Sequence, residues 1–339
     1  MRRRARVGEA LATIRRCGGL SVVILFVLAA CSAESPSVLS PEGDSAQRID
    51  RLWWSMLWIS LAVLAVVLGM MVAAIVRRNR RDVEIDRTTP PWGDPFIVIA
   101  GVAVPALILI AVFVVSLRDL DATTGQGDAT LTIDVIGHVW WWEVRYPGGA
   151  VTANEIHIPT GETVRFRLTS DDVIHSFWVP ELAPKIDMID GRTNVLDVRT
   201  DIPGTYRGQC AEFCGLQHAN MAFHVIAESR DEFDAWLQNE AEPAESDTET
   251  ASGLDVFMSS TCVGCHTIRG TEATGTLGPD LTHMASRLTL AAGTIPNSHE
   301  DLARWIEDPQ SIKPGNVMPP TELSDADLDA LIDYLETLD

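Results

Sequence analysis

Hydrophobic residues are concentrated in two long uncharged runs in the first third of this chain. Residues 52–76 and 95–117 contain no Asp, Glu, Lys or Arg. As an α-helix the first run would be about 37 Å long, which exceeds the ~30 Å hydrocarbon core of a bilayer. Trp53, Trp54 and Trp58 at its start are typical of a membrane interface. We predict a transmembrane hairpin over residues 52–118, because a buried hairpin of a soluble domain rarely has two runs of this length.

The loop between the two runs predicts their orientation. It carries five arginines, namely Arg77, Arg78, Arg80, Arg81 and Arg87. Because arginine is enriched in cytoplasmic loops, we expect this loop inside the cell and both flanking regions outside. Pro105 in the second run is compatible with a span, since neighbouring helices can satisfy the carbonyl group that it frees.

The N-terminal residues predict export. Residues 1–30 combine a basic start with a short apolar stretch, the pattern of a signal peptide. The stretch ends in Leu-Ala-Ala-Cys31, which resembles a bacterial lipoprotein box and implies a lipid on the sulfur of Cys31. A coincidental cysteine after an ordinary signal peptide is the alternative. Residues 31–51 are rich in Ser, Pro and acidic residues and predict an exposed lead-in.

Apolar and polar residues alternate in the middle of the chain. The alternation recurs at residues 131–136, 163–168 and 195–199, and Pro, Gly and Asp separate these segments. A period of two is typical of half-buried strands, and several short strands at this spacing indicate a β-sandwich. We place this domain at residues 125–238. Such a sandwich can hold ligand-bearing loops rigidly at one end.

The last quarter of the chain predicts an all-α domain. Residues 239–252 are acidic and lack large apolar side chains, which indicates a flexible linker. Within residues 253–339 we expect helices at 298–307 and 324–338, because each follows a Ser N-cap and has an acidic first turn.

Composition limits the class of partner. The chain has 339 residues, enough for two or three domains, and 47 Asp and Glu against 26 Lys and Arg. This acidic balance argues against nucleic acid and favours a basic partner.

Metal-binding residues are concentrated in one loop between the last two predicted strands. Cys210, Cys214, His218 and Met221 lie within it, and His175 lies upstream. Soft sulfur ligands combined with imidazole favour copper. The second cysteine allows two sulfurs to bridge two ions, which would then share an electron; this suits electron transfer. A disulfide would leave the histidines and methionine unexplained, and zinc would not account for Met221.

A second motif predicts a covalently bound haem. Cys262 and Cys265 are followed directly by His266 in the pattern Cys-x-x-Cys-His, in which the thiols bind haem c and the imidazole ligates iron. The sixth ligand should be a methionine. Met258 is too close to the motif and Met284 can be core filler, so Met318, in a Pro-rich loop, is the preferred ligand.

The copper motif, Cys-x-Glu-x-Cys-x3-His-x2-Met, resembles the CuA site of cytochrome c oxidase subunit II. The resemblance implies a cupredoxin-like domain in which Cys210 and Cys214 bridge two copper ions and His175 and His218 each bind one. Met221 and the backbone carbonyl of Glu212 would be weak ligands. The side chain of Glu212 would reach a magnesium ion at the boundary with subunit I.

The resemblance extends over the chain beyond its targeting end and implies a fused cytochrome c domain. Trp140 matches the tryptophan through which the family receives electrons from cytochrome c, although packing would also explain it. The implied protein is a multi-pass subunit of the bacterial plasma membrane. It would relay electrons from reduced cytochrome c, or a respiratory complex, to subunit I, with subunit III as a further partner.

Two alternative functions remain open at this stage. One is a haem–copper nitric oxide reductase with a similar copper subunit, and the other is a membrane-tethered carrier without an oxidase. The chain also departs from the family, which usually has a Glu at the start of the second span. Here only Asp94 lies nearby, so the residue that starts a proton pathway is left unassigned.

Overall fold

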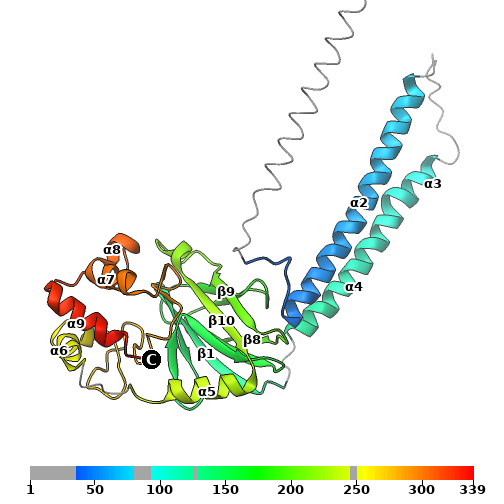
Figure 1. Cartoon of the computed structure of the whole chain (residues 1–339). Coiled ribbons are helices and arrows are strands. Elements are labelled where there is room, and N and C mark those ends of the chain that lie inside the picture. The colour runs from blue at the N-terminus through cyan, green and yellow to red at the C-terminus, as the bar shows by residue number, and fades with distance from the viewer. Residues whose placement is uncertain (1–35, 80–92, 125–127, 245–249) are drawn as a thin grey trace, which may run out of the picture. The chain divides into compact units, whose positions relative to one another are not determined.

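The computed structural model describes residues 36–79, 93–124, 128–244 and 250–339 (Figure 1). The chain separates into two compact units, residues 1–37 and 38–339, and all elements below belong to the second. The predicted signal peptide, Cys31 and the loop arginines from Arg80 to Arg87 lie outside the described residues.

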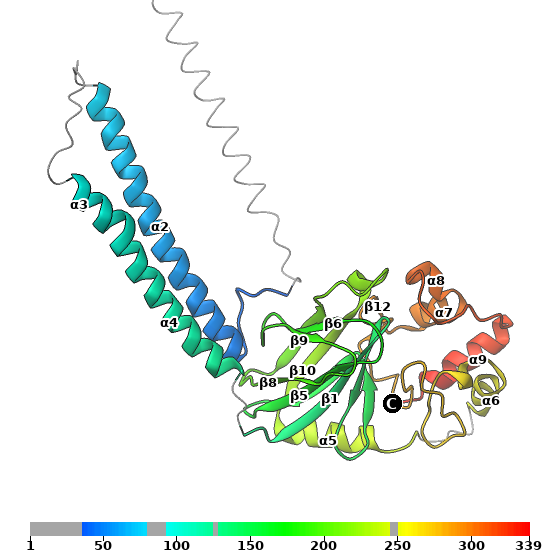
Figure 2. The same cartoon turned by 180° about the vertical axis from the view of Figure 1, so that it is seen from behind.

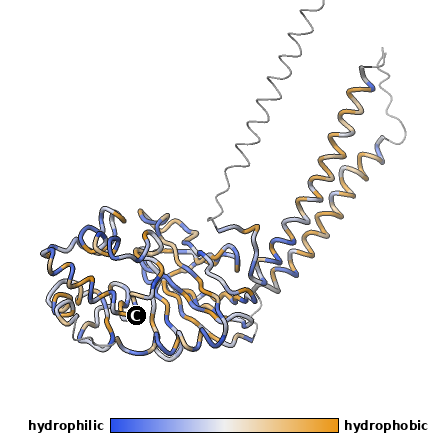
Figure 3. The backbone as a smooth tube through the Cα atoms, viewed as in Figure 1, coloured by the Kyte–Doolittle hydropathy of each residue, from blue (hydrophilic) through white to orange (hydrophobic). Residues whose placement is uncertain are grey.

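Both predicted spans are helical. The first is α2 (Asp44–Asn79), and the second consists of α3 (Gly93–Val98), η1 (Ile99–Ala103) and α4 (Val104–Thr124). Segments of 34 and 28 residues within them are long and apolar enough to cross a membrane, and hydrophobic residues dominate both helices (Figure 3). In the most apolar 18-residue window of each segment, no residue is buried inside the protein. The η1 segment is a π-helix that ends two residues before Pro105. A local π-turn of this kind accommodates a carbonyl that the proline cannot satisfy.

The prediction that residues 31–51 form an exposed lead-in is partly wrong, because helix α2 already begins at Asp44. The backbone N–H of Gly43 donates to the Glu181 carbonyl at 3.0 Å, and that of Asp44 donates to the Arg199 carbonyl at 3.1 Å. A Cβ atom at Gly43 would lie only 2.2 Å from the Leu182 carbonyl oxygen, so the contact requires glycine. The chain is thus fixed against the following domain before it turns into the first span.

The sandwich domain consists of two five-stranded sheets, ordered β3-β2-β1-β5-β8 and β4-β10-β9-β6-β7 (Figure 2). Trp142, Phe177 and Phe223 are completely buried between them, as expected for the inward face of alternating strands. The strands are β1 Leu131–His138, β2 Trp141–Arg145, β3 Val151–Ala153, β4 Glu155–Pro159, β5 Val164–Ser170, β6 His175–Trp178, β7 Ile186–Met188, β8 Asn194–Val198, β9 Gly204–Cys210 and β10 Ala222–Glu228.

Helix α5 (Arg230–Ala241) follows the last strand and ends inside the predicted linker. Ser229 and Glu232 form a capping box at its start, and Phe233 is buried against the sandwich core. The predicted flexible linker, residues 239–252, is partly ordered. Residues 239–241 are the end of α5, and the backbone N–H of Ala244 donates to the Arg269 carbonyl. Residues 245–249 lie outside the described part of the chain.

The C-terminal domain is built from short helices around its own apolar core. Phe257, Ile268 and Ile332 are almost completely buried there. Ser298 and Ser324 cap two helices as predicted, since each hydroxyl accepts from a backbone N–H three residues later. The elements are α6 Ala251–Ser259, η3 Cys262–Gly264, β11 Thr289–Leu290, β12 Ile295–Pro296, α7 His299–Glu307, α8 Pro309–Ile312 and α9 Asp325–Leu335.

Candidate copper and haem centres

The copper loop (residues 210–221) connects β9 to β10, because β9 ends at Cys210 and β10 begins at Ala222. His175 is the first residue of β6, which pairs antiparallel with β9 so that Phe177 lies opposite Cys210. Strand pairing therefore brings His175 next to the loop although 35 residues separate it from Cys210.

Both imidazoles lie beside the two sulfur atoms, each next to a different one. The Sγ atoms of Cys210 and Cys214 are 3.7 Å apart. His175 Nδ1 lies 3.9 Å from Cys210 Sγ, and His218 Nδ1 lies 3.8 Å from Cys214 Sγ. This is the arrangement required if two sulfurs bridge two ions and each ion also binds one histidine.

The sulfur spacing fits metal ions better than a disulfide. A disulfide bond is about 2.05 Å long, and both cysteines are free at 3.7 Å. Metal–sulfur bonds are about 2.3 Å long, so an ion on either side of the line between the sulfurs can contact both. Because two thiolates, two imidazoles and a thioether form a soft donor set, the chemistry of the site favours copper.

Two weaker donors complete the set. Met221 is buried, and its Sδ lies 3.8 Å from Cys214 Sγ. The backbone carbonyl oxygen of Glu212 lies 3.2 Å from Cys210 Sγ, whereas the Glu212 side chain is exposed. The structure thus brings together all six positions that the motif indicated.

Two residues that the sequence interpretation missed orient His175. Its Nε2 is 2.9 Å from Asp172 Oδ1, which leaves Nδ1 facing the sulfurs. Burial alone would lower the pKa of His175, but the bonds to Asp172 and Cys210 outweigh it and raise that pKa. Gly137 is needed for space, because a Cβ there would lie 2.8 Å from the His175 ring. The position of Asp172, three residues before the predicted ligand His175, is a sequence signal that could have identified it as the carboxylate that orients this histidine.

The hydrogen bond between the two sulfur atoms gives the cysteines opposite pKa shifts. It lowers the pKa of Cys210, assisted by His175 and by backbone partners, and it raises the pKa of Cys214. Because a metal binds the thiolate form of cysteine, loading of this site releases protons.

The haem-attachment residues lie on a tight turn. Cys262 is the first residue of η3 and Cys265 directly follows it, and the backbone N–H of His266 donates to the Cys262 carbonyl at 3.0 Å. His266 Nδ1 lies 2.8 Å from the Pro279 carbonyl oxygen, which leaves Nε2 to ligate iron. Burial lowers the pKa of His266, so the neutral, metal-binding form of the ring is favoured. A Cβ at Gly278 would lie 2.6 Å from this ring.

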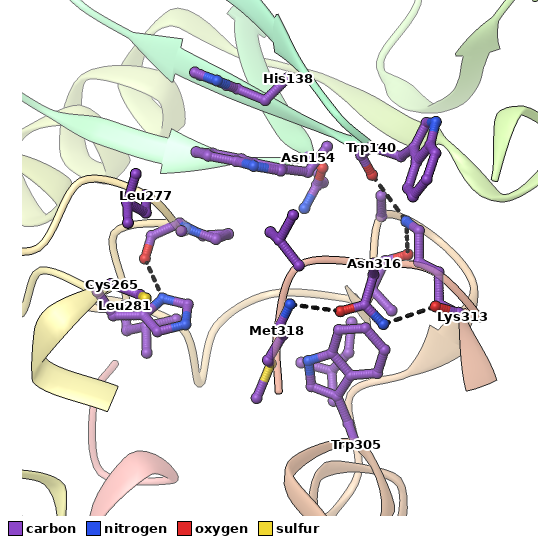
Figure 4. A pocket seen from close by; sticks show the side chains of 18 of the residues that line it. His138, Trp140, Asn154, Cys265, Leu277, Leu281, Trp305, Lys313, Asn316 and Met318 are labelled. Atoms are coloured by element: carbon purple, nitrogen blue, oxygen red, sulfur yellow. Dashed lines mark hydrogen bonds between the residues drawn. The ribbon is translucent and has the colours of Figure 1, made fainter. Parts of the chain in front are cut away.

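Met318 lines the same cavity as the attachment residues (Figure 4). Its backbone N–H donates to Asn316 Oδ1 at 2.8 Å, and Gln310 Nε2 donates to its carbonyl oxygen at 3.0 Å, so the loop is held firmly. By contrast, Met284 is 2% exposed within the apolar core and does not line the cavity. The geometry therefore favours Met318 over Met284 as the sixth ligand.

The cavity has a volume of about 440 Å³ and is shared by both extramembrane domains. The C-terminal domain contributes the attachment cysteines, His266 and apolar side chains such as Leu281 and Trp305. The sandwich domain contributes His138 and Asn154 (Figure 4), together with Trp141. A largely apolar cavity with two thiols, an imidazole and a thioether fits haem c. Nothing in the sequence indicated that the sandwich domain would form part of its wall.

Trp140 lies between the cavity and the copper loop. Its Nε1–H donates to the Cys214 carbonyl at 2.9 Å, and it lines the cavity as well. The Trp140 ring is half-buried, and Gly315 of the C-terminal domain lies close to it: a Cβ at Gly315 would be 3.9 Å from the ring. The family resemblance implies that Trp140 accepts electrons from an external donor. In this chain, its own C-terminal domain partly covers that residue.

Comparisons with known proteins match both extramembrane domains. Residues 150–228 match the family described as cytochrome C oxidase subunit II, periplasmic domain, and residues 250–339 match the cytochrome c family. The chain is 38% identical to cytochrome c oxidase subunit 2 of Alkalihalophilus pseudofirmus over 331 residues, which cover 94% of this chain and 95% of that protein. It is 32% identical to the Bacillus subtilis protein of that name over 349 residues, with coverages of 94% and 96%.

One solved structure matches a smaller part of the chain. The periplasmic domain of subunit II of cytochrome oxidase from Bradyrhizobium japonicum is 31% identical, with a TM-score of 0.33, over 34% of this chain and 95% of that one.

Proposed function

Because this chain belongs to the cytochrome c oxidase subunit II family, we propose that it is the electron-relaying subunit of a haem–copper cytochrome c oxidase. Electrons from an external donor reach the haem on Cys262 and Cys265, pass to the copper pair and continue to a haem of subunit I. Oxygen is reduced to water and protons are pumped in that partner chain. Residues of this chain do not take part in the oxygen chemistry.

The observation that carries the proposal is the proximity of two electron-transfer ligand sets. Trp140 lines the haem cavity and also donates a hydrogen bond to the carbonyl of Cys214, a copper ligand. Haem c and a sulfur-bridged copper pair both transfer single electrons without making or breaking bonds to substrate. Two such sites joined by one side chain are what a relay requires.

The protein's own contribution is to hold ligands rigidly. His175 is fixed by Asp172, and His266 by the Pro279 carbonyl. Cys210 and Met221 are buried and belong to the core of the sandwich. Because these groups are already placed, little rearrangement accompanies the arrival of an electron.

The membrane arrangement follows from the two apolar helices. The protein is membrane-anchored and has a periplasmic domain, in agreement with its family. We propose two spans in the bacterial plasma membrane, a lipid on Cys31, and both redox domains on the outer face. The exposed Glu212 side chain then meets subunit I, where it can help to bind Mg²⁺.

Oxygen uptake tests the function directly. Membranes that contain this subunit and its partner chains should consume oxygen when supplied with reduced cytochrome c. Failure to do so with copper and haem contents intact would contradict the oxidase proposal. Consumption of nitric oxide instead would favour a nitric oxide reductase, and consumption of neither gas would favour a tethered electron carrier.

A further inference from the structure

One buried lysine joins the two redox domains. Lys313 is 3% exposed, and its Nζ donates to the carbonyl oxygens of Trp140 at 2.8 Å and Ala291 at 2.9 Å. Trp140 belongs to the sandwich domain, whereas Ala291 belongs to the C-terminal domain. The chain has only one other lysine, Lys185, which is exposed.

Lys313 begins the Met318 loop (residues 313–318), which touches the copper loop at further points. Gln217 Nε2 donates to the Pro314 carbonyl at 2.6 Å, and Gln217 directly precedes the ligand His218. Gly315 approaches Leu216 so closely that a Cβ would lie 2.9 Å from its Cδ2 atom. The Met318 loop is therefore hydrogen-bonded to two residues of the sandwich domain, Trp140 and Gln217.

Packing alone does not explain an amine at this position. Burying an amine is costly unless hydrogen bonds replace its water, and here two backbone carbonyls accept hydrogen bonds from it. A methionine of similar length could fill the same space without that cost. The amine adds two directed bonds, which fix the position of one domain relative to the other.

We propose that Lys313 is a positioning residue that holds the haem domain docked at Trp140, so that the copper pair receives electrons from the haem of its own chain. This inference rests on the proposed relay function. The Met318 loop contacts Trp140 through Lys313 (Figure 4). The Trp140 indole in turn donates to the carbonyl of Cys214. An external donor then reduces the haem domain rather than Trp140, which the Met318 loop partly covers.

Chemical labelling of the two lysines tests the docked arrangement without any substitution. An amine-reactive ester is added to the full-length holoprotein at about pH 8, and peptide mass spectrometry follows Lys313 and Lys185. An accessible Lys313 would have the ordinary pKa of a lysine and would react about as fast as the exposed Lys185. We expect Lys313 to react at least about tenfold more slowly, because its amine is buried between the two domains. Equal or faster reaction would overturn the docked arrangement.

Electron transfer within the chain tests the role of the amine. After photoreduction of the haem in the holoprotein, the transfer rate to oxidised copper is measured in K313M and in the matched control K185M. Loss of two hydrogen bonds should slow transfer in K313M by about tenfold or more, with copper and haem spectra unchanged. K185M should match the wild type.

The possible results separate this inference from the proposed function. A wild-type rate in K313M would overturn the positioning role of Lys313. No transfer from haem to copper in the wild type would instead contradict the relay function. If K313M fails to load haem or copper, the labelling rates of Lys313 and Lys185 in the wild-type chain still show whether the haem domain is docked.

Discussion

At the scale of single residues, the copper loop gives each sulfur a separate histidine. The Sγ atoms of Cys210 and Cys214 are 3.7 Å apart, and each lies within 3.9 Å of its own imidazole nitrogen. Replacement of one cysteine by serine should leave a site for one ion at most, because the neutral hydroxyl of serine is a harder donor than a thiolate and is a poor substitute for a bridging sulfur.

We therefore expect C214S to abolish the electron paramagnetic resonance signal of the copper pair and to reduce copper content while haem absorbance persists. The reciprocal variant C262S should weaken haem attachment and leave the copper signal unchanged. Retention of a two-copper signal in C214S would show that Cys214 does not bridge.

Met318 provides a second test at this scale. M318A should keep the covalently attached haem but lose its axial sulfur, so that the methionine–iron absorption band disappears and the haem midpoint potential falls. M284L is the matched control, because Met284 is buried in the apolar core and a leucine should fill its space. Loss of the band in M284L but not in M318A would reverse the assignment.

Gly278 limits the position of the proximal histidine. A Cβ there would lie 2.6 Å from His266 Cε1, whereas a Cβ at Gly264 would meet nothing within 4 Å. G278A should displace the ring and lower the free energy of unfolding by about 1–3 kcal/mol, with an altered haem spectrum. G264A should behave like the wild type in thermal unfolding and absorption, and equal effects of both substitutions would contradict this steric argument.

At the scale of elements, helix boundaries depend on contacts distant in sequence. The polar residues before position 52 predicted an exposed lead-in, but backbone bonds to Glu181 and Arg199 fix the start of α2. Similarly, α5 extends into the acidic stretch, where the Arg269 guanidinium donates to the carbonyl oxygens of Glu240 and Ala241. Local composition indicates no such partners, which explains both errors.

Glu240 near the end of α5 makes the stability of this region dependent on pH. Burial raises the pKa of Glu240 to about 7, despite the nearby Arg287, His283 and Arg269. The unfolded chain releases the Glu240 proton near its ordinary pKa of 4.5, and the folded chain keeps it until about pH 7. Folding therefore becomes less favourable as pH rises through this window, by about 3 kcal/mol in total.

E240Q should remove this part of the pH dependence. Between about pH 4.5 and 7 the thermal midpoint of the wild type should fall relative to that of E240Q. E242Q is the control, since the Glu242 side chain is exposed. A constant difference between wild type and E240Q over this range would contradict a raised pKa.

At the scale of the whole molecule, the haem cavity is completed by two domains. His138 and Trp141 of the sandwich line it together with His266 and Met318 of the C-terminal domain. A tethered domain has a high effective concentration near its partner, and the contacts through Lys313 and Gln217 add a defined docking geometry.

Trp140 is the residue that belongs to both sites. W140F removes the indole N–H that donates to the Cys214 carbonyl. Transfer from haem to copper should slow by about fivefold, the equivalent of one neutral hydrogen bond, while the copper signal is retained. W236F is the control, because Trp236 stacks on His157 and does not line the haem cavity. An unchanged rate in W140F would show that this bond is not part of the route.

The sequence by itself determined the two apolar segments, the alternating strands, and the residues that we propose as copper and haem ligands. These features depend on local periodicity and on the spacing of chemically distinctive residues along the chain. Only the tertiary structure decided that Asp172 orients His175 and that Lys313 bonds to Trp140 across 173 positions of the chain. Hydrogen bonds between domains depend on which surfaces meet in three dimensions, and no local pattern of hydrophobic and polar residues specifies that.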